Sequence, residues 1–147
     1  MIKFISVNSN NYAHYKALAT RLIRNHKDGH ITVKGFKQFS QITKDKISKK
    51  ENTLILALYN NKVVGMLACG EKGHNFAITV VHKDYRGHGI AKGMLKKAID
   101  ECGSFYCEVA SDNLPSLKTC FTCNMVATDA FIRKGKVIMK MNTLNNT

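Results

Sequence analysis

Acidic residues and long apolar runs are both scarce in this chain. It holds 23 lysine and arginine residues against 10 aspartate and glutamate residues, a net charge of +13. No apolar run approaches the roughly 20 residues of a membrane-spanning helix. The N-terminal segment also lacks the apolar core and small-residue cleavage site of a signal peptide. These absences predict a soluble, cytoplasmic protein with no membrane partner.

Linkers, internal repeats and low-complexity segments are absent as well. With 147 residues, of which 44% are hydrophobic, the chain is long enough to bury a core of its own. We therefore expect one globular domain over residues 1–147. The composition leaves a monomer and a homodimer open.

The five cysteines do not form a recognisable metal-binding pattern. Cys120 and Cys123 make a Cys-x-x-Cys motif, but no second Cys/His pair stands at zinc-finger spacing. An odd number of cysteines without an export signal predicts free thiols. On a helix, positions i and i+3 share a face, so we expect these two side chains to pack there, and we expect no metal site.

Positive charge is concentrated near the N-terminus. Residues 1–50 hold eleven lysines and arginines and only two acids, Asp28 and Asp45, so this third carries +9 of the net charge. Such a field attracts coenzyme phosphates, an acidic substrate or nucleic acid. The alternative is a solvated surface that keeps the protein soluble.

Hydrophobic periodicity predicts a mixed α/β domain with the order β-α-α-β-β-β-α-β-α-β-β. Strands are expected over residues 1–7, 53–59, 62–70, 76–81, 105–110, 126–133 and 136–141. Helices are expected over 12–25, 33–50 (one basic helix or two short ones), 89–102 and 113–123, with Asp28–Gly29 ending the first and Gly103 the third. The run Phe76–Val81 is nearly all apolar, which is typical of a central strand covered on both faces.

The fourth strand leads through a glycine-containing turn directly into a helix. This turn holds Arg86, Gly87 and Gly89. Helix starts expose unpaired backbone N–H groups at the positive end of the helix dipole, and glycines let that backbone approach a phosphate closely. The segment is thus a candidate pyrophosphate site, with positive charge from Arg86. A Rossmann fingerprint is excluded because Lys92 stands where its last glycine belongs, and the Gly-Lys-Ser/Thr of a Walker loop is missing.

Arg86-Gly-His-Gly89-Ile-Ala91 resembles the coenzyme motif of the GNAT acetyltransferases, Arg/Gln-x-x-Gly-x-Gly/Ala, in full. The approach from Val81 to Arg86 is also similar to that of the family, with Lys83 where proline is common. The order of strands and helices resembles the family over the whole chain. The resemblance implies acetyl-CoA as co-substrate, no metal, and a sheet whose central parallel strands, Phe76–Val81 and Phe105–Ala110, splay apart.

The resemblance also implies roles for individual residues. Backbone groups of Thr79, Val80 and Val81 would pair with the pantetheine arm. The N–H of Val80 or Val81 would polarise the thioester carbonyl and stabilise the tetrahedral intermediate. The coenzyme pyrophosphate would be held by Arg86, Gly87, His88, Gly89, Ile90, Ala91 and Lys92.

A second family motif matches at Asn113 and Ser116, of which Asn113 would contact the pantetheine. Asn124 stands where the family has glycine, and asparagine tolerates the left-handed backbone expected there. Cys120 replaces the tyrosine that commonly protonates the leaving thiolate. A thiol with a pKa of roughly 8.5 can donate a proton, so Cys120 is either the acid or a packing residue.

A general base must take a proton from the acceptor amine. Candidates near the expected cleft are Glu71, His74, His82 and Glu108, of which Glu108 lies on the splayed strand and is the candidate we carry forward. No spacing separates them further.

We expect an N-acetyltransferase that moves the acetyl group of acetyl-CoA to a primary amine by direct attack. The resemblance implies an acceptor wall formed by the first two helices and the last hairpin. Because these helices carry few acids, the acceptor is expected to be small and not polycationic. Two alternatives stay open: an acetyltransferase directed to nucleic acid or aminoacyl-tRNA through its basic first third, and a catalytically weak module that binds coenzyme or a protein partner.

Overall fold

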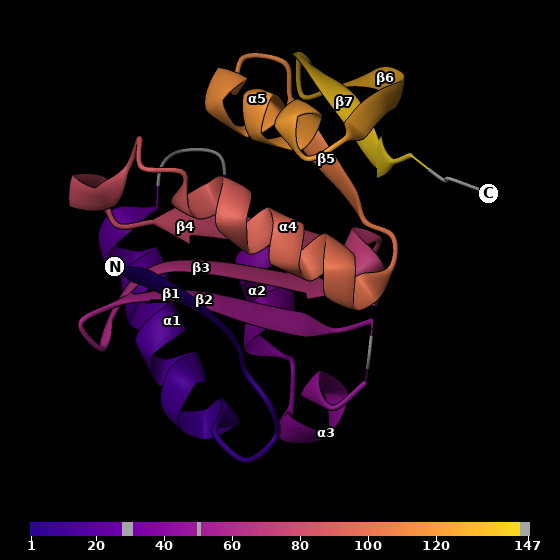
Figure 1. Cartoon of the computed structure of the whole chain (residues 1–147). Coiled ribbons are helices and arrows are strands. Elements are labelled where there is room, and N and C mark those ends of the chain that lie inside the picture. Colours follow the sequence, from indigo (N-terminus) through magenta and orange to yellow (C-terminus); the bar gives the residue numbers. More distant parts are fainter. Residues whose placement is uncertain (28–30, 50, 145–147) are drawn as a thin grey trace.

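The computed structural model describes residues 1–27, 31–49 and 51–144 and contains two β-sheets (Figure 1). The first sheet has the strand order β1-β2-β3-β4 and is antiparallel throughout. Its strands are β1 (Ile2–Ser6), β2 (Thr53–Tyr59), β3 (Lys62–Gly70) and β4 (Phe76–Val81). The second sheet has the order β5-β7-β6, with β5 (Tyr106–Ala110), β6 (Met125–Arg133) and β7 (Lys136–Thr143).

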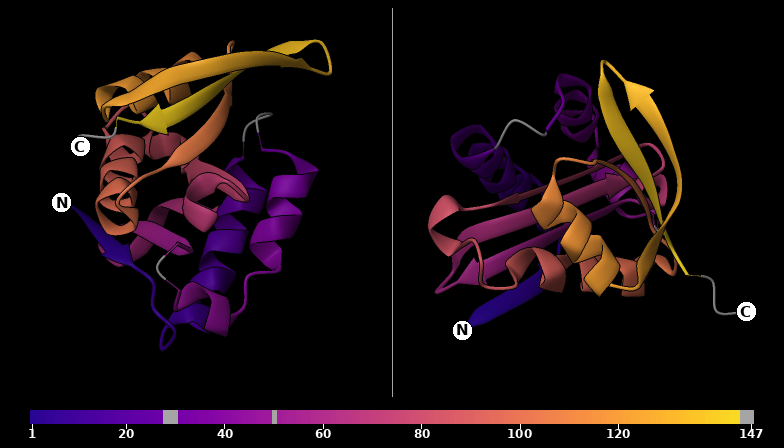
Figure 2. Two further views of the ribbon diagram at one scale, coloured as in Figure 1. Left: turned by 90° about the vertical axis from the view of Figure 1, so that its right-hand side faces the viewer. Right: turned by 90° about the horizontal axis from the view of Figure 1, so that it is seen from above.

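Helices cover both faces of the first sheet. Two N-terminal helices, α1 (Tyr12–His26) and α2 (Val33–Ser40), pack on one face, and α4 (Ile90–Cys102) packs on the other (Figures 1 and 2). The short α3 (Lys44–Ile47) follows α2, and α5 (Leu114–Thr122) lies beside the second sheet. Each face has its own buried cluster, so the sheet separates two hydrophobic cores.

The predicted separation of the two central strands is present. Strand β4 forms an edge of the first sheet and β5 an edge of the second, and α4 provides the crossover between them. The element order and the mixed α/β class are confirmed. The basic second helix is in fact two pieces, α2 and α3, and the predicted break at Asp28–Gly29 lies outside the described residues.

One expectation about β4 was wrong. The strand is not covered on both faces: Phe76, Ile78 and Val80 are buried, whereas Thr79 is exposed. The apolar run conceals an alternation: on the second face Ala77 and Val81 are only partly buried against the α4-side core, and Thr79 is exposed. An edge strand offers unpaired backbone groups, and this property defines the candidate site.

A close approach fixes β5 against the turn before β4. A Cβ atom on Gly73, in the 3-10 turn η1 (Glu71–Gly73), would lie 1.7 Å from the carbonyl oxygen of Tyr106, so only glycine fits. The imidazole of the next residue, His74, stacks on the Tyr106 ring with 4.7 Å between centroids. These contacts hold the start of β5 beside the start of β4.

Candidate functional site

The loop that follows β4 exposes main-chain donors at the start of α4. Gly87 and Gly89 adopt the left-handed φ angles +83° and +77°, and a Cβ atom on either would meet no atom within 4 Å. No side chain caps the helix, and its first internal hydrogen bond runs from Gly93 N to Gly89 O at 3.0 Å. The three N–H groups ahead of it, on Ile90, Ala91 and Lys92, therefore have no acceptor within the helix.

The free edge of β4 adds a second row of backbone groups. His82 N donates to Val64 O at 2.8 Å, and Val81 stands opposite Gly65 in the pairing with β3. Antiparallel pairing alternates, so Val80 turns its N–H and C=O toward β3 while Thr79 and Val81 turn theirs away. Of the two donors that the sequence left open, Val81 is the one whose N–H lies on the free edge.

Arg86 uses its side chain inside the protein. Its Nε donates to Val81 O at 3.1 Å, and one terminal nitrogen donates to His26 O at 2.6 Å. It thereby ties the end of α1 to the end of β4. The imidazoles of His26 and His82 lie against each other beside these hydrogen bonds, tilted by 31° with 3.9 Å between ring centroids. The predicted charge of Arg86 is present at the loop, but its hydrogen bonds serve the loop's structure.

Together these features fit an extended ligand with a charged end. Lys83, Arg86 and Lys92 are exposed around the loop, and the nearby acid is Asp84. Uncapped amides, a helix dipole and surplus positive charge favour a diphosphate. The free edge of β4 favours an arm that carries its own amide groups.

Comparison with protein families gives a match over residues 16–120 to the model described as "Acetyltransferase (GNAT) family". The chain belongs to the acetyltransferase (GNAT) family. Acetyl-CoA is accordingly its acetyl donor. A sequence comparison with curated proteins gives no significant match.

Solved structures of other GNAT proteins have the same fold at low sequence identity. An acetyltransferase of the GNAT family from Streptococcus pneumoniae is 14% identical with a TM-score of 0.70. The alignment covers 97% of this chain and 98% of that chain. The yncA protein of Salmonella typhimurium, solved with acetyl-CoA, is 15% identical with a TM-score of 0.70 and coverage of 99% and 95%. The NatC complex bound to Gag peptide and CoA is 17% identical with a TM-score of 0.74 and coverage of 97% for both chains.

Within this GNAT protein, Cys120 lies in a pair of thiols. Its side chain on α5 is only 4% exposed, and its Sγ lies 3.7 Å from the Sγ of Cys107 on β5. The hydrogen bond with Cys107 lowers the pKa of Cys120, against burial, which raises it. The same bond, followed by burial, raises the pKa of Cys107. The role of Cys120 as acid stays a prediction; its burial fits the packing alternative equally.

The predicted base, Glu108, is already engaged. Its two carboxylate oxygens accept hydrogen bonds of 2.8 Å each from Tyr106 Oη and from the guanidinium of Arg133 in the β6–β7 hairpin. Burial raises the pKa of Glu108, but these two bonds and the Arg133 charge outweigh it and lower the pKa overall. Burial and the Glu108 contact raise the pKa of Tyr106 to about 12. Glu108 can therefore act only as a weak base.

The other three candidate bases lie in two places. Glu71 lies in the turn before β4 beside a polar pocket, with the exposed His74 close by. His82 is at the opposite end of the strand, where its Nδ1 accepts a hydrogen bond from Asp84 N at 3.1 Å. The lone pair of that nitrogen is thus already engaged by a backbone N–H group. This arrangement disfavours His82 as a base.

Asn113 and Ser116 come together at the start of α5. The side-chain oxygen of Asn113 accepts from Ser116 N at 3.4 Å and caps the helix. Asn124 adopts a φ of +63°, so the predicted left-handed position is confirmed. Whether the first two contact the pantetheine stays a prediction.

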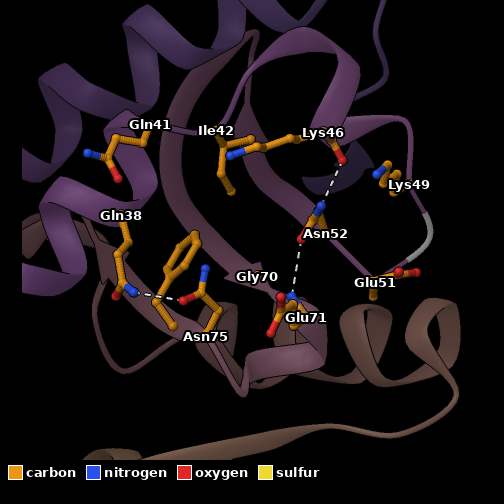
Figure 3. Close-up of a pocket in the computed structure, with 11 residues that line it drawn as sticks. Gln38, Gln41, Ile42, Lys46, Lys49, Glu51, Asn52, Gly70, Glu71 and Asn75 are labelled. Carbon is orange, nitrogen blue, oxygen red and sulfur yellow. Dashed lines mark hydrogen bonds between the residues drawn. The ribbon is translucent and has the colours of Figure 1, made fainter.

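A pocket of about 230 Å³ lies away from this loop, between α2, α3 and the turn before β4 (Figure 3). Amide side chains line it, and Gln38 donates to Asn75 across it at 2.7 Å. The pocket adjoins the start of β4, whereas the glycine loop follows its end. Sequence reasoning did not find this pocket, because its walls come from three separate segments.

The basic first third is mostly exposed surface. Lys16 is an exception: its ammonium group donates to the carbonyl oxygens of Ser40 and Ile42, at 2.7 and 2.8 Å, and so fixes α1 to the chain after α2. Arg21, Arg24, Lys34 and Lys37 are exposed.

The described part of the chain shows neither a membrane span nor a metal cluster. None of its helices has the length and apolarity needed to cross a membrane. No group of three or more His, Cys, Asp or Glu side chains there could hold a metal ion. The five cysteines all lie in the described part and none forms a disulfide. Cys120 and Cys123 are both buried in the core on the α4 side, as the packing interpretation predicts.

Proposed function

We propose that this GNAT protein is an N-acetyltransferase that transfers acetyl to a primary amine by direct attack of that amine. The observation that carries the proposal is the continuity of the free edge of β4 with the uncapped, glycine-bordered start of α4. When bound, acetyl-CoA supplies an activated acetyl thioester. Residues of this chain bind and orient the donor and transfer the protons.

The main chain binds and orients the donor. The amides of Ile90, Ala91 and Lys92 hold the diphosphate, and the outward N–H and C=O of Thr79 pair with the pantetheine arm. The N–H of Val81 donates to the thioester carbonyl oxygen. Such a preoriented donor stabilises developing negative charge by roughly 3–4 kcal/mol in comparable acyl-transfer sites. Val80 is unsuitable for this role because β3 uses its N–H.

Two side chains move protons in this proposal. Cys120 protonates the departing thiolate, assisted by a pKa that lies below the usual thiol value. Glu108 accepts a proton from the acceptor, and its lowered pKa restricts it to a modest effect. The Arg133 contact fixes its orientation.

The acceptor is a small amine that is not polycationic. Exposed lysines and arginines on α1 and α2 would repel a polyamine and attract an acceptor that carries a carboxylate or phosphate beside its amine. Thiol release from acetyl-CoA with a panel of amines tests this proposal. We expect turnover with an amino acid or an amine-bearing nucleotide and little with spermidine.

The same experiment distinguishes the alternatives. Coenzyme binding without thiol release from any amine would contradict catalysis and favour a binding module. Turnover that requires RNA, with binding that weakens steeply as salt is raised, would favour a nucleic-acid-directed enzyme. Absence of coenzyme binding would overturn the proposal altogether.

A further inference from the structure

Three of the five cysteines meet where α5 packs against β5 and α4. Cys107 comes from β5, while Cys120 and Cys123 come from the end of α5. Sequence spacing pairs Cys120 with Cys123, but space pairs it with Cys107, at 3.7 Å between sulfur atoms. The Cys123 thiol instead donates to Lys92 O in the first turn of α4 at 3.7 Å.

We propose that Cys107 and Cys120 form a reversible disulfide under oxidising conditions, and that this bond switches off acetyl transfer. The second part rests on the proposed function, in which Cys120 is the proton donor. A disulfide needs about 2.0 Å between sulfur atoms, so the pair must close by roughly 1.7 Å, which small side-chain rotations can supply. The segment between β5 and α5 is short, and two backbone hydrogen bonds fix it. Ser111 N donates to Val137 O at 2.8 Å, and Asn113 N donates to Ala110 O at 2.9 Å.

The chemistry balances with a peroxide as oxidant. The Cys120 thiolate attacks one peroxide oxygen, the O–O bond breaks, the other oxygen leaves as hydroxide and takes up the proton that the thiol released to become water, and Cys120 becomes a sulfenic acid. The Cys107 sulfur then attacks the Cys120 sulfur, the S–O bond breaks and water leaves. Two thiols and one hydrogen peroxide thus give one disulfide and two water molecules. A dithiol reductant reverses the result by thiol–disulfide exchange.

The bond has two consequences for the site. It consumes the S–H that Cys120 offers to the leaving thiolate. It also cross-links α5 to β5, the strand that carries Glu108, so the side of the site formed by these two elements becomes covalently fixed. Loss of a general acid commonly costs a factor of about 10² or more, so we expect transfer to fall by more than about tenfold.

The test treats the full-length protein with equimolar hydrogen peroxide and follows mass, peptide linkage and acetyl transfer. We expect the mass of two hydrogen atoms to be lost, a linked peptide pair containing Cys107 and Cys120, a fall in transfer, and recovery with dithiothreitol. The variant Cys107→Ala leaves an oxidised Cys120 without its partner, so it should give neither the linked peptide pair nor the loss of two hydrogen masses. The matched control, Cys123→Ala, keeps the pair and should remain sensitive.

Three results would overturn the inference. These are a bond mapped to another pair of thiols, no bond at all in the wild-type protein, or a mapped Cys107–Cys120 bond with unchanged transfer. Calorimetry with acetyl-CoA on the reduced protein separates this inference from the proposed function. If the reduced protein fails to bind acetyl-CoA, the proposed function is wrong. The mass and peptide-linkage measurements test the formation of the disulfide independently of that result.

Discussion

Replacement of Gly89 by alanine should separate coenzyme binding from folding. Gly89 has a φ of +77° at the start of α4, and Gly103 has a φ of +79° at its end; an added Cβ meets no atom within 4 Å at either position. Alanine in the left-handed region costs about 1–2 kcal/mol. Both variants should therefore lower the melting temperature by a similar amount, roughly 3–8 °C for a chain of this size.

The two variants should differ in affinity for acetyl-CoA. A methyl group at Gly89 stands where the diphosphate approaches, and it should break at least one hydrogen bond to a charged group. Such a bond contributes about 1.5–3 kcal/mol, which corresponds to a loss of roughly 10- to 150-fold in affinity. Gly103 lies about 20 Å away along the helix and should bind the coenzyme like the wild type.

Isothermal titration calorimetry with acetyl-CoA on the wild type and the two variants measures this difference, and circular dichroism melts verify that the variants are equally folded. Equal affinity for all three proteins would refute the placement of the diphosphate at the start of α4. A loss of affinity in both variants would show that helix stability, and not the loop, controls binding.

Further predictions concern the neighbouring elements. Gly73→Ala should cost about 3 kcal/mol or more, because its Cβ would lie 1.7 Å from the Tyr106 carbonyl oxygen at a φ of +98°; a urea midpoint close to that of the wild type would contradict this contact. Glu108→Gln should reduce kcat by less than about tenfold, because the carboxylate is a weak base; a larger loss would show that it is the principal base. The lowered pKa of Glu108 also means that it stabilises the fold above the ordinary carboxyl pKa, so the stability difference between this variant and the wild type should vanish as the pH falls through the lowered value. Burial, followed by the neighbouring charges, lowers the pKa of His26, so the unfolded chain binds its proton more readily and stability should fall as the pH drops through the ordinary value of 6.5; His26→Asn should flatten that slope in urea titrations, and an unchanged slope would exclude the effect.

The conformation of the loop at the start of α4 could be predicted from sequence because it is set locally. Gly87, Gly89 and the following helix stand next to each other in the chain, and left-handed backbone at a helix start requires glycine. The same holds for Asn124, whose left-handed φ was expected from the residue type. Element order followed from periodicity, with errors mainly at element ends.

The contacts that adjust reactivity could not be predicted, because they join distant segments. The partner of Glu108 is Arg133, and the partner of Cys120 is Cys107 rather than the Cys123 of the motif. Their pairing depends on how the β6–β7 hairpin and α5 dock on β5, which no local pattern encodes. The cover of β4 was misjudged for the same reason, since its apolar run does not show that the strand ends a sheet.

Amide resonances of ¹⁵N-labelled protein, followed during titration with acetyl-CoA, test the central claim most directly. The account predicts that the N–H signals of Ile90, Ala91 and Lys92, together with those of Thr79 and Val81, shift strongly and saturate together, while that of Gly103 stays in place. Saturable binding that leaves these five signals unmoved, or that shifts residues of the pocket in Figure 3 instead, would contradict it.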